Sequence, residues 1–240
     1  MSFEVASFDG PHPLVQAAAS EWLKELRLSL KSSALRCVAL SGGRIAEPFF
    51  VALAKQAAPP GTWDQVHFFW ADERCVGPAD PESNFATARK SLLIPLGIPE
   101  DRIHRIRGEE PPDFAALEAE TELCRLARAG AQSQPVLDLV FLGMGENGHV
   151  ASLFPGESEA EMASKAVYRP VTADKPPPRR ITLGYAALAA ASKMWVLVSG
   201  AGKAAALRES LQPEGQTPLA RVLRSRGNTR ILTDVRVAGQ

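Results

Sequence analysis

The chain has 240 residues, 45% of them hydrophobic, and its 27 Lys and Arg residues equal its 27 Asp and Glu residues in number. A chain of this length and composition can build a sizeable α/β core, whereas the neutral balance provides no field that would draw it to nucleic acid or to an anionic membrane. Any affinity for anions must be local, so we expect a phosphorylated metabolite as partner rather than a polymer.

Residues 1–9 lack a basic segment followed by an apolar one, and no later stretch reaches the roughly eighteen apolar residues of a membrane span. The three cysteines, Cys37, Cys75 and Cys124, lie far apart without CxxC spacing. They predict neither a disulfide framework nor a zinc knuckle. We therefore expect a cytoplasmic protein.

Short apolar runs alternate along the chain with segments of helical period, which is typical of a mostly parallel sheet covered by helices. The proline-rich turns are too short for interdomain linkers and no long repeat is present, so we expect residues 1–240 to form a single domain. The expected strands are residues 4–8, 36–40, 66–70, 138–142, 167–172, 180–183, 194–198 and 230–233, and the expected helices are residues 13–30, 46–56, 84–93, 114–129, 185–191 and 203–211.

Ligands of open α/β sheets gather at the carboxyl ends of strands, and four such ends carry notable residues. The first is Ser41-Gly42-Gly43, directly before the helix expected from Ala46. Backbone N–H groups and the helix start can face an anion there, with the Ser41 hydroxyl as a further donor. A tight turn, in which the glycines only supply positive φ, explains the same residues.

The second strand end is Asp72-Glu73-Arg74, which follows the hydrophobic strand at 66–70. Charges placed where a strand leaves the core form either a solvated loop or an ordered polar cluster in a cleft. Downstream, Ser83-Asn84 can cap the next helix, so Asn84 has a structural role that requires no ligand.

The third strand end opens onto Gly143, Gly145, Gly148 and His149, the layout of a small-molecule site. The glycines match GxGxxG, but Pro155-Gly156 breaks the helix that a dinucleotide turn requires, and the next strand ends without an acid for the ribose. The pattern therefore disfavours a nucleotide site. The other histidines, His12, His67 and His104, lack comparable surroundings, and we expect them at the surface or in packing contacts.

The fourth feature is basic: Arg179-Arg180 opens a strand and Gly202-Lys203 opens a helix. Leu197 stands where a Walker motif has glycine, and Ala204 replaces its Ser or Thr, which excludes an ATP loop. An ammonium group at a helix N-terminus is unfavourable unless an anion such as phosphate balances it. A lysine that extends into water is the alternative.

Together these motifs resemble, from end to end, the 6-phosphogluconolactonases of the glucosamine-6-phosphate isomerase/lactonase superfamily. The most specific part is residues 143–155, Gly-Met-Gly-x-x-Gly-His-x-Ala-Ser-Leu-Phe-Pro, because the sister deaminases typically continue Gly-His with Ile-Ala-Phe-Asn. The resemblance implies an α/β fold of three layers, α/β/α, with a mostly parallel Rossmann-like sheet of the sugar-phosphate isomerase/CoA-transferase type.

The resemblance also implies hydrolysis of 6-phospho-D-glucono-1,5-lactone to 6-phosphogluconate in the oxidative pentose phosphate pathway, by a monomer or small homo-oligomer without metal or cofactor. In this hypothesis His149 is the general base on water, backbone N–H groups of residues 143–148 hold the oxyanion, and Asp72 and Asn84 position hydroxyls or His149. The expected phosphate ligands are Ser41, Gly42, Gly43, Arg74, Arg180 and Lys203, and Gly145 and Asn147 complete the expected substrate-binding set.

Two positions depart from the family pattern: Arg44-Ile45-Ala46 stands where Ser-Thr-Pro is usual, and Asn147 stands where Asp is usual. Arg44 adds a phosphate donor if it points inward. Asn147 removes a carboxylate that would raise the pKa of His149, which leaves the neutral imidazole that a base needs. Two other functions stay open: an isomerase/deaminase that releases ammonia from glucosamine 6-phosphate, and a sugar-phosphate-binding protein without turnover.

Overall fold

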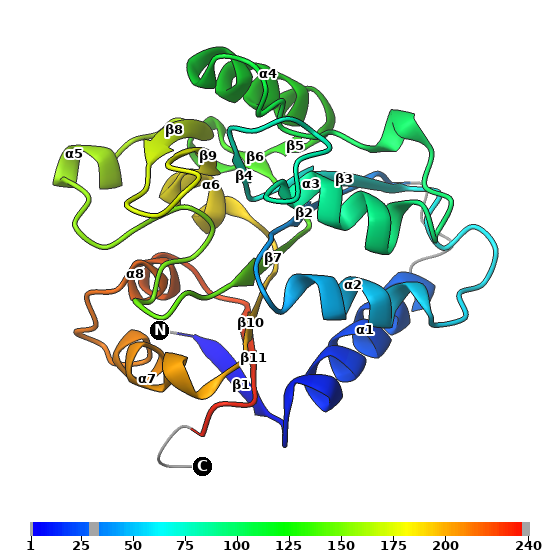
Figure 1. Ribbon diagram of the computed structural model, residues 1–240, viewed down its shortest axis with the longest axis horizontal. Helices are drawn as coiled ribbons and strands as arrows, with labels where there is room; N and C mark the ends of the chain where they lie inside the picture. Colours follow the sequence, from blue (N-terminus) through cyan, green and yellow to red (C-terminus); the bar gives the residue numbers. More distant parts are fainter. Residues whose placement is uncertain (1, 29–33, 237–240) are drawn as a thin grey trace.

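The computed structural model describes residues 2–28 and 34–236 and contains a six-stranded sheet (Figure 1). Every neighbouring pair of its strands is parallel, so all their carboxyl ends lie at one edge. This confirms the expected mostly parallel sheet. The strand order is β1 (Phe3–Ser7), β11 (Thr229–Thr233), β10 (Met194–Val198), β7 (Leu139–Gly143), β2 (Arg36–Leu40) and β3 (Val66–Trp70).

A separate antiparallel sheet has the order β4 (Asp72–Arg74), β9 (Arg179–Leu183) and β8 (Tyr168–Thr172). The strands expected at 167–172 and 180–183 therefore exist but lie outside the main sheet. They pair antiparallel, because the six residues between β8 and β9 are too few for a parallel crossover. Strand β4 was not predicted; its charged residues pair with β9. A further short pair consists of β5 (Arg128–Ala129) and β6 (Pro135–Val136).

Helices cover both faces of the main sheet and complete three layers, α/β/α (Figure 1). On one face lie α1 (Pro11–Leu28), α2 (Ala46–Ala54) and α3 (Asn84–Ala88), which continues into a π-helical turn (Arg89–Leu93). The other face carries α7 (Ala204–Ser210) and α8 (Pro218–Ser225), and α6 (Tyr185–Ala190) packs on α8. Helix α4 (Pro112–Leu126) packs on β8 and β9, and a short α5 spans Glu159–Met162.

Several helix predictions need correction. The helix expected over 114–129 ends at Leu126, since Arg128 and Ala129 pair with β6 instead. The segment expected from Lys203 begins with a 3₁₀ turn, Ala201–Lys203, before α7. Helix α8 was missed, although Thr217 followed by Pro218 is a recognised helix-start signal. Residues 29–30 of the first expected helix lie outside the described residues.

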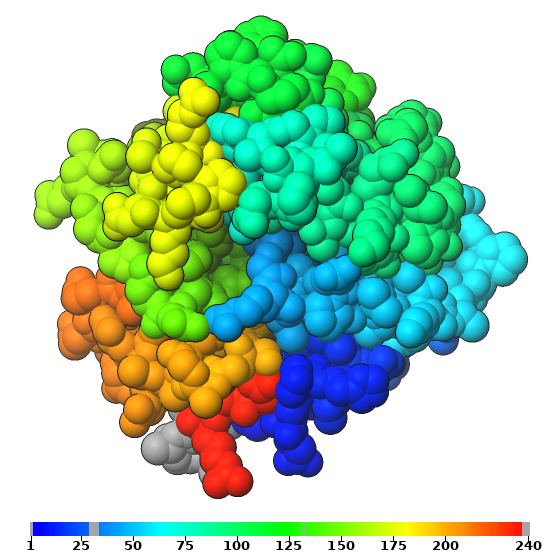
Figure 2. Space-filling view, in the orientation of Figure 1, coloured from blue at the N-terminus to red at the C-terminus, as the bar shows by residue number. Residues whose placement is uncertain are grey.

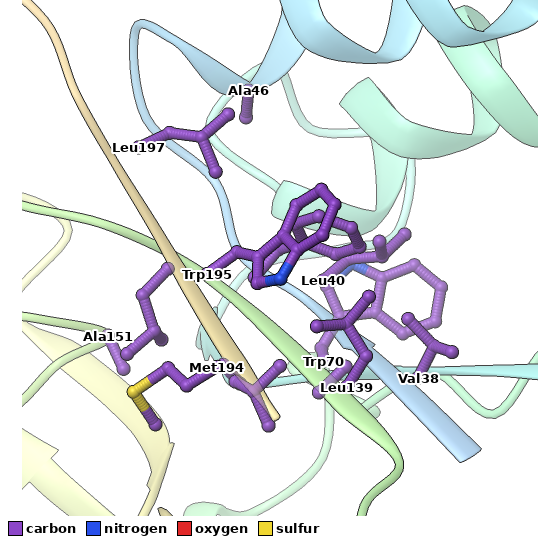
Figure 3. Close-up of a cluster of buried hydrophobic side chains, with 14 of the residues drawn as sticks. Val38, Leu40, Ala46, Trp70, Leu139, Ala151, Met194, Trp195 and Leu197 are labelled. Carbon is purple, nitrogen blue, oxygen red and sulfur yellow. The ribbon is translucent and has the colours of Figure 1, made fainter. Parts of the chain in front are cut away.

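The core lies between the sheet and its helices. Figure 3 shows side chains from three adjacent strands, among them Leu40, Leu139 and Trp195, gathered in one cluster, and none of these three is more than 4% exposed. Trp22 of α1 meets Phe141 of β7 edge to face, with ring centroids 4.8 Å apart. Each such large side chain contributes about 1.5–3 kcal/mol on burial, so the strands are a rigid support for the loops at their ends.

After the adjacent strands β2 and β7, the chain continues toward opposite edges of the sheet. Strand β2 is followed through α2 by its neighbour β3, whereas β7 is followed in this sheet by β10, its neighbour on the side away from β2. The carboxyl ends of such a strand pair form the crevice where open α/β sheets bind ligands. In Figure 2 the light-blue surface after β2 meets the bright green surface after β7, next to the orange segment that begins α7. No helix in residues 2–28 or 34–236 is long and apolar enough to cross a membrane.

Candidate active site

Asp72 joins three segments at the carboxyl edge of the sheet, and it is only 4% exposed. Its carboxylate accepts hydrogen bonds from the Ser41 hydroxyl at 3.0 Å and the Ser152 hydroxyl at 2.8 Å. The Asn84 amide donates to the Asp72 backbone carbonyl at 2.8 Å. At this position the chain forms an ordered polar cluster, not a solvated loop. Because the Ser41 hydroxyl donates to Asp72, it is not the free anion donor that we expected.

The loop after β2 approaches Asn84 so closely that position 42 must be glycine. A Cβ atom on Gly42 would lie 1.8 Å from Asn84 Oδ1. Gly43 has φ +95°, in the left-handed region. The backbone N–H groups of both glycines donate to no described residue, and α2 begins at Ala46, so these donors and a helix start share the same loop.

Glu73 is a buried carboxyl group whose role the motif did not reveal. It is 2% exposed, and burial raises its pKa to about 7 although backbone N–H donors oppose this. These hydrogen bonds tie β4 to the start of α3, where Ser83 caps the helix as predicted, and they hold Asn84 against Asp72. The donors are the N–H groups of Arg74, Asn84 and Phe85 and the Ser83 hydroxyl, at 2.7–3.0 Å.

His149 lies in the loop after β7, and its tautomer follows from its contacts. Its Nδ1 lies 2.6 Å from Asn147 Oδ1, and its own backbone N–H donates to the same oxygen at 3.4 Å. Since the amide oxygen only accepts, Nδ1 carries the proton and Nε2 presents a lone pair. No described residue is hydrogen-bonded to Nε2. The imidazole therefore has the form that a general base requires.

The charge state of His149 follows from its surroundings. Burial lowers the pKa of His149, and the cations of Arg180, Lys175 and Lys203 lower it further, while Asp72 raises it. The neutral imidazole thus prevails at pH 7. Asp72, Arg180 and Lys203 are therefore each within electrostatic reach of His149.

Two neighbours hold the imidazole ring in place. A Cβ atom on Gly145 would lie 2.0 Å from His149 Cε1, so only glycine fits beside the ring. The Phe154 ring also lies close to the imidazole, with ring centroids 5.0 Å apart. The guanidinium carbon of Arg180 lies 5.6 Å from the centroid of the Phe154 ring, so Phe154 is a neighbour of both His149 and Arg180.

Two cations near this imidazole are buried and form no ion pair with any described residue. Arg180 is 8% exposed and donates only to the carbonyls of Pro177 and Lys175. It faces Arg74 across β4 and β9, and burial and then this like charge lower the pKa of Arg180. Lys203 is 6% exposed, and its ammonium group has no hydrogen-bond or ion-pair partner among the described residues. Buried unpaired cations are costly, so an anion bound beside them would offset that cost.

The loop of residues 143–148 uses part of its backbone internally. The Gly145 N–H donates to His149 O at 2.9 Å and the Gly148 N–H to Gly145 O at 3.1 Å. The expected oxyanion donors therefore exclude these two groups. The N–H groups of Glu146 and Asn147 have no acceptor in the described chain and stay available.

Other predicted positions have simpler roles. Arg44 forms an ion pair with Glu146 Oε1 at 2.7 Å. Burial raises the pKa of the Cys75 thiol, which keeps it protonated. His67 and His104 stack on each other and His12 is exposed, as predicted for packing or surface residues. No three His, Cys, Asp or Glu side chains within residues 2–28 and 34–236 are grouped to ligate a metal ion.

Sequence reasoning missed two members of the polar cluster. Ser152 is fully buried, and its backbone N–H donates to Thr182 Oγ1 at 3.2 Å while its hydroxyl donates to Asp72. The signal for Ser152 was its place three residues after His149 in the same motif. Thr182 has no local signal, because its position opposite Asp72 arises from the pairing of β4 with β9.

Comparisons with known proteins agree with this architecture. The family model for glucosamine-6-phosphate isomerases/6-phosphogluconolactonase matches residues 9–231. The 6-phosphogluconolactonase of a Nostoc species is 34% identical over 192 residues, covering 80% of this chain and 78% of that protein. The 6-phosphogluconolactonase of Mycobacterium tuberculosis is 33% identical over 216 residues, covering 88% and 87%.

A solved structure shows the same likeness in three dimensions. The 6-phosphogluconolactonase of Trypanosoma brucei superimposes with a TM-score of 0.81 at 27% identity, over 96% of this chain and 95% of that one. Sequence motifs, fold and coverage thus point the same way. The chain belongs to the glucosamine-6-phosphate isomerase/6-phosphogluconolactonase family.

Proposed function

We propose that this enzyme hydrolyses 6-phospho-D-glucono-1,5-lactone to 6-phosphogluconate, a step of the oxidative pentose phosphate pathway, with His149 as general base. The names of the relatives, several of them 6-phosphogluconolactonases at 33–34% identity, support the reaction. The observation that carries the site assignment is the neutral imidazole with an unpartnered Nε2 beside two buried cations that lack carboxylate partners.

The first step is the attack of water on C1 of the lactone. His149 Nε2 takes a proton from the water, the oxygen forms a bond to C1, and the carbonyl electrons move to the oxygen as an oxyanion. The free N–H groups of Glu146 and Asn147 are the donors we assign to that oxyanion. A base of this kind contributes about 10² to 10⁴ in rate, or roughly 3 to 5 kcal/mol of barrier.

Collapse of the intermediate breaks the bond between C1 and the ring oxygen. His149 returns its proton to that oxygen, which becomes the 5-hydroxyl group, and the new carboxylic acid ionises in water. Each proton is accounted for by water and one imidazole. These steps route through no metal or cofactor.

The phosphate lies, in this proposal, between Lys203 and the arginine pair Arg74 and Arg180, with the N–H groups of Gly42 and Gly43 as neutral donors. Such a dianion supplies the counter-charge that the buried cations lack. Asp72 and Asn84 act as positioning residues, because their hydrogen bonds hold together the loop after β2, the start of α3 and the loop of His149.

The test is steady-state hydrolysis of freshly prepared lactone, coupled to oxidation of the product and corrected for spontaneous opening. His149→Ala lowers kcat by about 10² to 10⁴ with little change in KM, while His12→Ala, at an exposed position, leaves kcat unchanged. Lys203→Ala and Arg180→Ala mainly raise KM. A wild-type kcat in the His149→Ala variant would refute the base assignment, and release of ammonia from glucosamine 6-phosphate would favour the deaminase.

A further inference from the structure

An ion pair joins the two loops on which the proposed site depends. Arg44 Nη2 lies 2.7 Å from Glu146 Oε1, and the residues are 102 positions apart in the chain. Arg44 belongs to the loop after β2, and Glu146 to the loop after β7 that carries His149. Their side chains are 80% and 58% exposed, so the pair lies at the surface, above the meeting point of the two strands.

The carboxylate of Glu146 lies among the proposed phosphate ligands. A Cβ atom on Gly202 would meet Glu146 at 3.5 Å, which places this side chain directly over the residue that precedes Lys203. Burial and then the Arg44 cation lower the pKa of Lys203, whereas the carboxylates of Asp234 and then Glu146 raise it. Glu146 is thus an anionic group beside two cations, the kind of position that a phosphate would take.

We propose that Glu146 is an internal competitor of the substrate phosphate, and that Arg44 exchanges its Glu146 partner for the phosphate when substrate binds. This inference rests on the proposed function. Under this proposal Arg44 determines specificity for phosphorylated lactones. The exchange also releases the loop of Asn147 and His149 from Arg44 only when a phosphate is present.

The energetics suit an exchangeable contact. An exposed ion pair has little net strength in water, so a phosphate displaces the carboxylate at little cost. A guanidinium group offers a phosphate two parallel N–H donors, which form shorter and stronger charge-assisted hydrogen bonds. The exchange therefore favours the dianion over the single carboxylate.

The decisive experiment is a double-mutant cycle on binding of inorganic phosphate and of 6-phosphogluconate, measured by calorimetry without turnover. Glu146→Gln tightens both about two- to fivefold, which corresponds to about 0.4 to 1 kcal/mol. Arg44→Gln weakens both about tenfold. In the Arg44→Gln background, Glu146→Gln has no further effect on either affinity, because the guanidinium group for which Glu146 and the phosphate compete is absent.

Glu4→Gln is the matched control, since Glu4 is also an exposed, ion-paired carboxylate, 69% exposed, but lies near the start of β1 at the opposite edge of the sheet. It leaves phosphate binding unchanged. If Glu146→Gln tightens binding equally in both backgrounds, the carboxylate acts only through its field and the exchange is wrong. An unchanged affinity in Glu146→Gln also overturns it.

Kinetics separate this inference from the proposed function. In Glu146→Gln the ratio of kcat/KM for the 6-phosphorylated lactone to that for D-glucono-1,5-lactone rises, and in Arg44→Gln it falls; ratios equal to that of the wild type contradict the exchange. If the enzyme hydrolyses the lactone but the effects of Arg44→Gln and Glu146→Gln on binding are additive, the proposed function stands and the exchange is wrong. If the protein binds phosphate with the expected double-mutant cycle but does not hydrolyse the lactone, the proposed function is wrong and the exchange stands.

Discussion

The contact between Gly145 and His149 leads to a sharp test of how the proposed base is held. In Gly145→Ala the new Cβ would lie 2.0 Å from His149 Cε1 and 2.1 Å from Nδ1, whereas ordinary contacts begin at 3.4 Å. The ring must retreat by the difference between 3.4 and 2.0 Å, about 1.4 Å, and lose its hydrogen bond to Asn147. A misplacement of about 1 Å costs roughly 100-fold in rate, so we expect kcat to fall at least about 100-fold.

The assay is the coupled hydrolysis of fresh lactone, with the unfolding temperature measured in parallel. Gly145 does not have a positive φ, so alanine causes no backbone strain there. We therefore expect the variant to fold and KM to change less than kcat. Gly10→Ala is the control, because nothing lies within 4 Å of its Cβ position and its φ is not positive. A Gly145→Ala enzyme within about threefold of the wild-type kcat would show that the ring does not need this position.

Three further changes test the surroundings of the site. Asn147→Asp adds a carboxylate beside His149, whose pKa is lowered in the wild type by burial and by nearby cations, and so raises that pKa. The acid limb of kcat/KM therefore moves to higher pH; an unmoved limb contradicts this. Glu73→Gln replaces two acceptor positions with an amide donor and lowers the free energy of unfolding in urea by about 1–3 kcal/mol, and a loss below about 0.5 kcal/mol argues against its anchoring role. Ser152→Ala removes a donor to Asp72 and lowers kcat about tenfold; an unchanged kcat removes Ser152 from the positioning cluster.

The central strands of the main sheet were predictable because they are buried on both faces. The sequence predicted Arg36–Leu40, Val66–Trp70 and Met194–Val198 with their observed bounds, since each is a short apolar run between polar residues. Strand β4 was not predictable, because Asp72–Arg74 has no apolar alternation and becomes a strand only by pairing with β9. Local sequence carries no record of a partner more than 100 residues away.

In the candidate site, too, residues marked by local sequence could be predicted, and residues whose contacts depend on the fold could not. His149 and Lys203 could be identified, because glycines, a strand end and a helix start mark them locally. The direction of Arg44 could not, since its partner Glu146 is set by the adjacency of β2 and β7. The buried acceptor role of Glu73 was hidden for the same reason, because three of its four donors come from a helix start ten or more residues later.

Asn147, one of the two departures from the family pattern, affects the pKa of the His149 imidazole. Asn147 keeps the hydrogen bond that orients His149 but supplies no charge, so among the groups that perturb the imidazole only Asp72 raises its pKa and three cations lower it. A less basic imidazole transfers protons with less driving force but is fully deprotonated over a wider range of pH. Phosphate binding reverses part of this, because a dianion beside Lys203 and Arg180 offsets the cations that depress the pKa. The base therefore becomes stronger once substrate is bound, so the acid limb of kcat lies at higher pH than that of kcat/KM.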